Sequence, residues 1–118
     1  MQLARDITKE RTRYMALNKR QVKFLKKRAH TIDPIFQIGK NGMTDTILSE
    51  LTDAIEKREL IKVQLLQNTL ETNADVKTYI EEHSPIKVIQ SIGNVLVLYK
   101  SSSNENNRFI SDQVRNIQ

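Results

Sequence analysis

Two glycines enclose a lysine and an asparagine at Gly39-Lys40-Asn41-Gly42. The apolar run Ile35–Ile38 precedes them and a helical apolar pattern starts at Met43, which predicts a strand, a tight loop and a helix in succession. Glycine adopts backbone angles that other residues resist and lets a ligand approach closely. The helix start adds unpaired N–H groups and a positive dipole end, and Lys40 adds a cation. This chemistry suits a phosphate, although an ordinary strand-to-helix turn has the same pattern.

The positive charge of the chain is concentrated just before this loop. The 118 residues carry a net charge of +5, but residues 17–40 alone hold seven lysines and arginines and one acidic residue. Residues 1–16 have a net charge of +2, and residues 41–118 have a net charge of −3. Such segregation is typical of proteins that bind polyanions, although a solvated lysine-rich helix face has the same composition.

A helix is predicted from Lys19 to about His30, with Asn18 as its cap. Three apolar residues on one side form the stripe expected to face the core: Val22, Leu25 and Ala29. The basic residues fall on a separate arc about 120° wide, and they are Lys19, Arg20, Lys23, Lys26, Lys27 and His30. Phe24 and Arg28 lie outside both stripes, and Phe24 can either pack on a flank or offer an exposed ring for stacking.

The rest of the chain alternates between helical and strand patterns. Thr44 or Asp45 is expected to cap a second helix, which leads to a strand over residues 60–66. A short helix then carries Val76, Tyr79 and Ile80, and strands over 86–92 and 95–99 are joined by the hairpin signal Gly93-Asn94. This order predicts an α/β fold, a four-stranded mixed sheet packed with three helices. The basic helix and the glycine loop are expected at one end of that sheet.

One domain over residues 17–100 is predicted, with a flexible basic extension over 1–16 and a polar, disordered tail over 101–118. Within the tail, Phe109 and Ile110 can form a short docking helix. The chain has no cysteine, no signal-peptide pattern and no apolar stretch near the ~20 residues of a membrane span. We therefore expect a cytoplasmic protein.

The residue types disfavour catalysis. With two histidines, His30 and His83, and no cysteine, the usual metal-ligand and thiolate sites are missing. The sequence has no serine nucleophile elbow, and the loop after Gly39 lacks the Lys-Ser/Thr pair of a nucleotide-binding P-loop. We expect a protein that is not an enzyme, has no small-molecule substrate and carries neither a metal nor another cofactor.

Nucleic-acid binding agrees better with these features. Lysine and arginine neutralise phosphates, and glycine loops of this kind clamp a nucleic-acid backbone in the KH module. The six aromatic residues do not form the stacking platform of an RRM, so contacts to backbone and shape, as in structured RNA, are favoured. Two alternatives stay open: a protein-interaction module whose basic helix docks on an acidic protein surface, and a DNA-binding protein.

Several segments resemble, in order, the CRM domain (chloroplast RNA splicing and ribosome maturation), in particular its stand-alone bacterial YhbY-type form. The resemblance covers residues 17–100 and rests on Lys19-Arg20-Gln21, Arg28-Ala29-His30, residues 34–42, residues 59–63, residues 88–93 and residues 95–99. The extension before Leu17 and the tail after Ser101 lie outside the family pattern.

The resemblance implies a monomeric RNA-binding domain whose fold is similar to the C-terminal domain of translation initiation factor 3. It also implies ribosomal RNA in precursors of the large ribosomal subunit as the partner, and a role as an assembly factor. The RNA contacts that it implies are the basic residues of the first helix together with Gly39, Lys40, Asn41 and Gly42.

Overall fold

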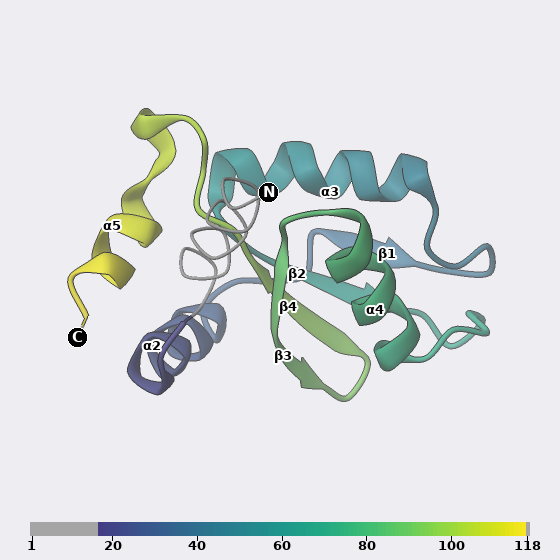
Figure 1. The fold of residues 1–118 in the computed structure, drawn as a ribbon. Helices are drawn as coiled ribbons and strands as arrows, with labels where there is room; N and C mark the ends of the chain where they lie inside the picture. Colours follow the sequence, from purple (N-terminus) through teal and green to yellow (C-terminus); the bar gives the residue numbers. More distant parts are fainter. Residues whose placement is uncertain (1–16, 118) are drawn as a thin grey trace, which may run out of the picture.

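Four strands form one mixed sheet in the computed structural model, which describes residues 17–117 (Figure 1). The strands are β1 (Phe36–Ile38), β2 (Leu60–Leu65), β3 (Lys87–Ile92) and β4 (Val95–Tyr99), and their order in the sheet is β1-β2-β4-β3. β1 is parallel to β2, and β4 is antiparallel to both β2 and β3. This arrangement confirms the predicted four-stranded mixed sheet. The predicted extension over 1–16 lies outside the described residues.

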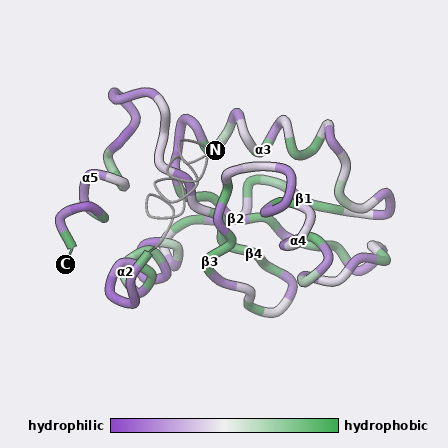
Figure 2. Tube along the Cα trace, in the orientation of Figure 1, coloured by the Kyte–Doolittle hydropathy of each residue, from purple (hydrophilic) through white to green (hydrophobic). Residues whose placement is uncertain are grey.

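Helices cover both faces of the sheet. The helices α3 (Asp45–Arg58) and α4 (Asn73–His83) lie on one face, whereas α2 (Lys19–Ala29) and α5 (Phe109–Arg115) lie on the other (Figure 1). The larger core joins α3 and α4 to inward residues of the strands, including Ile61, Val63, Leu96 and Leu98. A second core contains Leu25, Ala29, Leu60, Val97, Tyr99 and Val114. The hydropathy colouring shows apolar stretches along the central strands and polar stretches along α2 and α5 (Figure 2).

Side-chain caps fix where three of the helices begin. Asn18 accepts a hydrogen bond from the backbone N–H of Gln21, and the Gln21 side chain accepts one from the N–H of Asn18. Thr44 caps α3 in the same way through the N–H of Ile47, and Thr72 caps α4. Each such cap satisfies a backbone donor that would otherwise lack a partner at the helix start.

The prediction of a disordered tail over 101–118 is wrong for residues 101–117. This segment contains a 3₁₀ helix (Glu105–Asn107) and then α5, which begins at Phe109 and confirms the short docking helix expected at Phe109 and Ile110. Its composition is polar, but two acidic residues at the end of α3 hold it, and Val114 reaches the second core. Composition alone misses such long-range polar anchoring.

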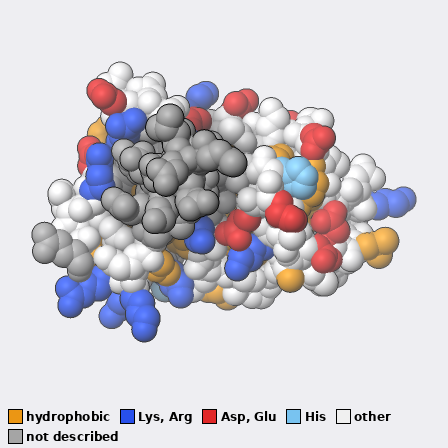
Figure 3. Space-filling model, viewed as in Figure 1, with side chains coloured by type: hydrophobic (Ala, Val, Ile, Leu, Met, Phe, Trp, Pro, Cys, Tyr) orange, Lys and Arg blue, Asp and Glu red, His pale blue; other side chains and the backbone are white. Residues whose placement is uncertain are grey.

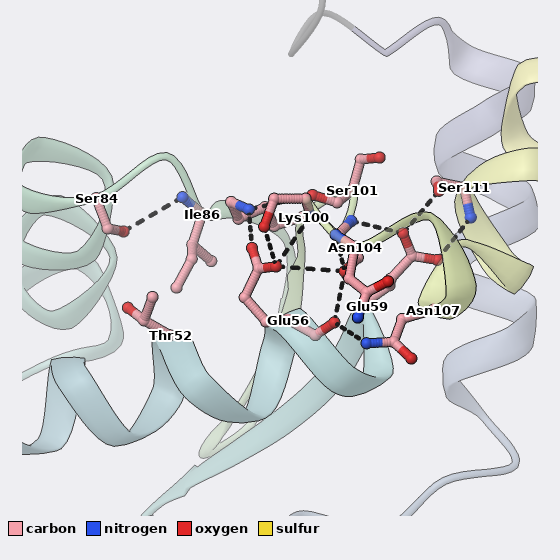
Figure 4. A network of polar contacts seen from close by, with 12 residues as sticks. Thr52, Glu56, Glu59, Ser84, Ile86, Lys100, Ser101, Asn104, Asn107 and Ser111 are labelled. Atoms are coloured by element: carbon pink, nitrogen blue, oxygen red, sulfur yellow. Dashed lines mark hydrogen bonds and ion pairs between the residues drawn. The ribbon is translucent and has the colours of Figure 1, made fainter.

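Glu59 is the main anchor of this C-terminal segment. Its side chain is fully buried, and its backbone turns from α3 into β2 with φ of 66°. One carboxylate oxygen accepts the N–H groups of Ile110 at 3.1 Å and Ser111 at 2.9 Å. The other accepts the N–H of Ser102 at 2.7 Å and the hydroxyl of Ser111 at 2.6 Å (Figure 4). Because α5 has no side-chain cap of its own, Glu59 serves as its cap.

Glu56 holds the start of the same segment. Its carboxylate pairs with Lys100 and accepts the N–H of Ser103 at 2.9 Å and the Ser103 hydroxyl at 2.6 Å (Figure 4). Burial raises the pKa of Glu56, but the hydrogen bonds from Lys100 and Ser103 outweigh it and lower the pKa from 4.5 to about 2.

This pKa shift predicts a pH dependence of stability. Because the pKa of Glu56 is lower in the folded chain, the ionised carboxylate stabilises the fold above pH 4.5, and this stabilisation is lost as the pH falls toward 2. We expect Glu56→Gln to lower the free energy of unfolding at neutral pH and to have little effect near pH 2. Urea denaturation of the wild type and of Glu56→Gln across this pH range measures the two free energies of unfolding. A difference between them that does not change with pH would contradict the prediction.

Candidate nucleic-acid interface

The six predicted basic residues lie together on one face of α2, with His30 directly after the last residue of the helix. Figure 3 shows blue lysine and arginine side chains gathered where α2 lies, whereas red acidic side chains gather over α4. Lys26 is half-buried, and the other five side chains are exposed: Lys19, Arg20, Lys23, Lys27 and His30. This set is called the basic face below.

The N-terminal part of the basic face is unfavourable for the helix itself. Lys19 and Arg20 stand in the first turn, near the positive end of the helix dipole, and that turn has no acidic residue. Lys19, Lys23 and Lys27 follow one another at a spacing of four residues, where like charges repel. Among the described residues, neither these three lysines nor Lys26 forms an ion pair. Lys26 and Lys27 stand in the last turn, where cations complement the dipole, so helix stability leaves Lys19, Arg20 and Lys23 unexplained, whereas an external anion explains them.

The opposite side of α2 packs on the second core through Leu25 and Ala29, as predicted. Phe24 is partly buried against the same core, so its ring packs on a flank and does not stand free for stacking. The prediction for Val22 is wrong, since Val22 is half-buried and belongs to neither core. Helical spacing places Val22 on the same side of α2 as Leu25 and Ala29. In the structure, however, neither core extends to the edge of α2 where Val22 lies.

Gln21 ties α2 to the C-terminal segment. Its side-chain amide donates to the carbonyl oxygen of Val114 at 3.0 Å and to that of Ile117 at 3.4 Å. The same side chain completes the cap of α2 through the N–H of Asn18 at 2.9 Å. Contact with α5 thus helps to fix the orientation of the basic face, a role with no signal in the local sequence.

The glycine loop forms the tight turn that the sequence predicts. The N–H of Gly42 donates to the carbonyl of Gly39 at 2.9 Å, and Gly42 has a φ of 67°, which favours glycine. Lys40 and Asn41 are exposed at the tip of the turn. Their backbone N–H groups make no hydrogen bond within the described part of the chain.

The carboxylate of Glu71 binds the backbone next to Gly42. Glu71, in the connection between β2 and α4, accepts the N–H of Met43 at 2.7 Å. A Cβ atom built on Gly42 would lie only 1.9 Å from the Glu71 Oε1 atom. The sequence predicts that Gly42 lets a phosphate approach the backbone closely. The carboxylate of Glu71 fills that space instead. Asp45 in the first turn of α3 adds a second negative charge near the loop.

The basic face and the glycine loop do not lie at one end of the sheet, which corrects that prediction. α2 packs on Leu60, the first residue of β2, whereas the loop follows Ile38, which pairs with Leu65 at the other end of β2. These strand ends are about 17 Å apart at a typical rise per residue. Figure 1 shows α2 and the loop between β1 and α3 at opposite ends of the molecule. The two groups therefore cannot hold the same phosphate.

The Gly42 geometry predicts a difference between two glycine variants. Gly42 and Gly93 both have positive φ, but only Gly42 faces Glu71, and nothing lies within 4 Å of a Cβ on Gly93. Gly42→Ala should cost about 3 kcal/mol, since it adds backbone strain and displaces Glu71 from the Met43 N–H, and Gly93→Ala about 1 kcal/mol. Chemical denaturation measures both, and equal losses would contradict the role of Glu71.

Within residues 17–117, no cluster of histidine and acidic side chains is arranged to hold a metal ion. Over the same residues, no helix combines the length and apolar character needed to cross a bilayer.

Two bacterial proteins match about three quarters of this chain. The "Probable RNA-binding protein YqeI" of Bacillus subtilis is 44% identical over 86 residues, which is 73% of this chain and 90% of that protein. An "RNA-binding protein" of Haemophilus influenzae is 36% identical over 86 residues, covering 73% of this chain and 87% of that protein.

A solved structure is similar as well. The solution structure of the hypothetical protein SAV1595 from Staphylococcus aureus has a TM-score of 0.64 and 37% sequence identity to this chain. The match covers 76% of this chain and 94% of that protein. The sequence profile of the CRS1 / YhbY (CRM) domain matches residues 17–100. The chain therefore belongs to the CRS1 / YhbY (CRM) domain family.

Proposed function

We propose that this protein binds RNA through the basic face of α2. The observation that carries the proposal is a row of cations on one helix side, with no ion pair to Lys19, Lys23, Lys26 or Lys27 in the described residues. Lysines that have no carboxylate partner are free to neutralise phosphates and release counterions. The names of the two bacterial relatives, each of which contains the words RNA-binding protein, support RNA as the polyanion.

We propose the glycine loop as a second, separate RNA contact. Lys40 and Asn41 are exposed there, and their backbone N–H groups have no hydrogen-bond acceptor among the described residues. Because Glu71 and Asp45 lie beside this loop, its attraction for a phosphate is weaker than that of the basic face. An RNA that contacts both sites would extend from the basic face of α2 to the glycine loop.

The proposed biological target is ribosomal RNA in precursors of the large ribosomal subunit, bound in the cytoplasm by a monomeric, non-catalytic assembly factor. The resemblance to the stand-alone bacterial members of the family supports this target. A basic face that contacts phosphates and shape also suits a large folded RNA better than a short defined sequence.

Binding titrations with RNA, duplex DNA and an acidic protein test which class of partner this protein binds. Structured ribosomal RNA should bind more tightly than duplex DNA of equal length, and an acidic protein should not displace it at equal charge concentration. Preference for duplex DNA would indicate a DNA-binding protein, and displacement by the acidic protein would indicate a protein-docking helix.

Gradient sedimentation of cell extracts tests the target. The protein should migrate with precursors of the large subunit rather than with mature ribosomes or free protein. Absence from the precursor fractions would contradict the assembly role while leaving RNA binding itself intact.

A further inference from the structure

A groove of about 320 Å³ runs along the edge of α2 that the second core leaves uncovered. It is lined by Leu17, Lys19, Val22, Lys23 and Lys26. The four helical residues lie within an arc of about 100° and so share one side of α2. Leu17 packs against the second core just before the helix begins. The groove thus has an apolar floor and three lysines at its rim.

Val22 is the residue that distinguishes this groove from a plain basic surface. A valine surrounded by lysines contributes nothing to either core, yet it remains half-buried. The methylene stems of the lysines extend the apolar surface around it, while their ammonium groups reach solvent. A bare phosphate would leave the floor uncovered, and a purely apolar ligand would leave the three charges without a partner.

We propose that this groove receives one unpaired nucleotide of the bound RNA, with its base on Leu17 and Val22 and the flanking phosphates on Lys19, Lys23 and Lys26. The inference rests on the proposed function and adds to it a preference for RNA with unpaired nucleotides. Single-stranded bases can be splayed out onto a protein surface, whereas paired bases inside a duplex cannot. The positive end of the α2 dipole near Lys19 strengthens the attraction for phosphate.

Changing the apolar floor of the groove without changing its charge tests this inference. Val22→Gln replaces part of the apolar floor with a longer, uncharged polar side chain, and it should weaken binding to an RNA with an unpaired loop about fivefold, because the base loses its apolar contact. Binding to a fully paired RNA duplex should stay unchanged, and so should the salt dependence, because no phosphate contact is lost. Val22→Ala should produce a smaller loss with the same selectivity.

The lysines of the face provide an internal comparison. Lys26 lines the groove and Lys27 does not. Lys26→Ala should therefore reduce the preference for the looped RNA over the duplex, whereas Lys27→Ala should weaken binding to both RNAs equally. Leu70→Ala, at a 95% exposed apolar residue elsewhere, is the control for a lost surface side chain. Circular dichroism confirms that each variant is folded.

The outcomes separate the two proposals. If both Val22 variants bind the looped RNA like the wild type while the lysine variants bind more weakly, the groove inference is wrong and the basic face stands. If the lysine variants also bind both RNAs like the wild type, the proposed function fails together with the groove.

Discussion

A variant with Lys19, Lys23 and Lys27 replaced by alanine is expected to bind structured RNA about 100-fold more weakly, the loss for about three phosphate contacts. The slope of the logarithm of affinity against the logarithm of salt concentration should become shallower by about 2 to 3 for the same reason. All three side chains are exposed, and alanine is the best helix former, so the fold should be unaffected.

A matched variant shows whether position or only net charge matters. Lys57, Lys77 and Lys87 are also exposed, but they lie on α3, α4 and β3 rather than on α2. Their triple alanine variant has the same net charge as the α2 variant. We expect it to bind RNA within about threefold of the wild type, since screened charges away from the interface act weakly. Equal losses in the two variants would show that the basic face is not the binding surface.

The largest expected effect on stability comes from Glu59→Gln. Each carboxylate oxygen of Glu59 accepts two hydrogen bonds from the C-terminal segment. A glutamine keeps the size, but its amide nitrogen would face two donors whichever way it turns. Because the site is fully buried, water cannot relieve this conflict. We expect a loss of about 2 to 4 kcal/mol in the free energy of unfolding.

Denaturant unfolding and hydrogen exchange together test this anchor. Residues 101–117 should exchange faster in Glu59→Gln, while the strands keep their protection relative to global unfolding. Glu50→Gln, at an exposed position on α3, is the matched control and should change stability by less than about 0.5 kcal/mol. Unchanged exchange of the C-terminal segment in Glu59→Gln would mean that Glu59 does not hold it.

Local signals were sufficient to predict most of the fold. The caps at Asn18, Thr44 and Thr72 act on N–H groups three residues away, so the sequence around each helix start contains the whole signal. The hairpin at Gly93-Asn94 is equally local. The four-stranded mixed sheet followed from the order of these elements, and the likeness to the C-terminal domain of translation initiation factor 3 stays a prediction.

Contacts between distant residues could not be predicted in the same way. Glu59 and Ser111 are 52 residues apart, and Glu71 and Met43 are 28 apart, so nothing near either partner marks the hydrogen bond. The contact between Glu59 and Ser111 orders a C-terminal segment whose composition indicates disorder. The contact between Glu71 and Met43 places a carboxylate at the glycine loop, where the sequence suggests room for a phosphate.

The candidate site shows the same division. Helical spacing correctly grouped the cations of α2, because a helix face depends only on residues within a few turns. The relative position of α2 and the glycine loop depends on which end of the sheet each one meets, and periodicity has no information about that. Val22 followed the core pattern in sequence but lies at an edge that no other described element covers.

Amide NMR spectra of the full-length protein during titration with structured RNA test the central claim most directly. RNA binding through the basic face predicts that the largest shift changes fall on residues 19–30, with smaller changes at Lys40 and Asn41. Shift changes confined to α4 or to the C-terminal segment, with α2 unaffected at saturation, would contradict the account.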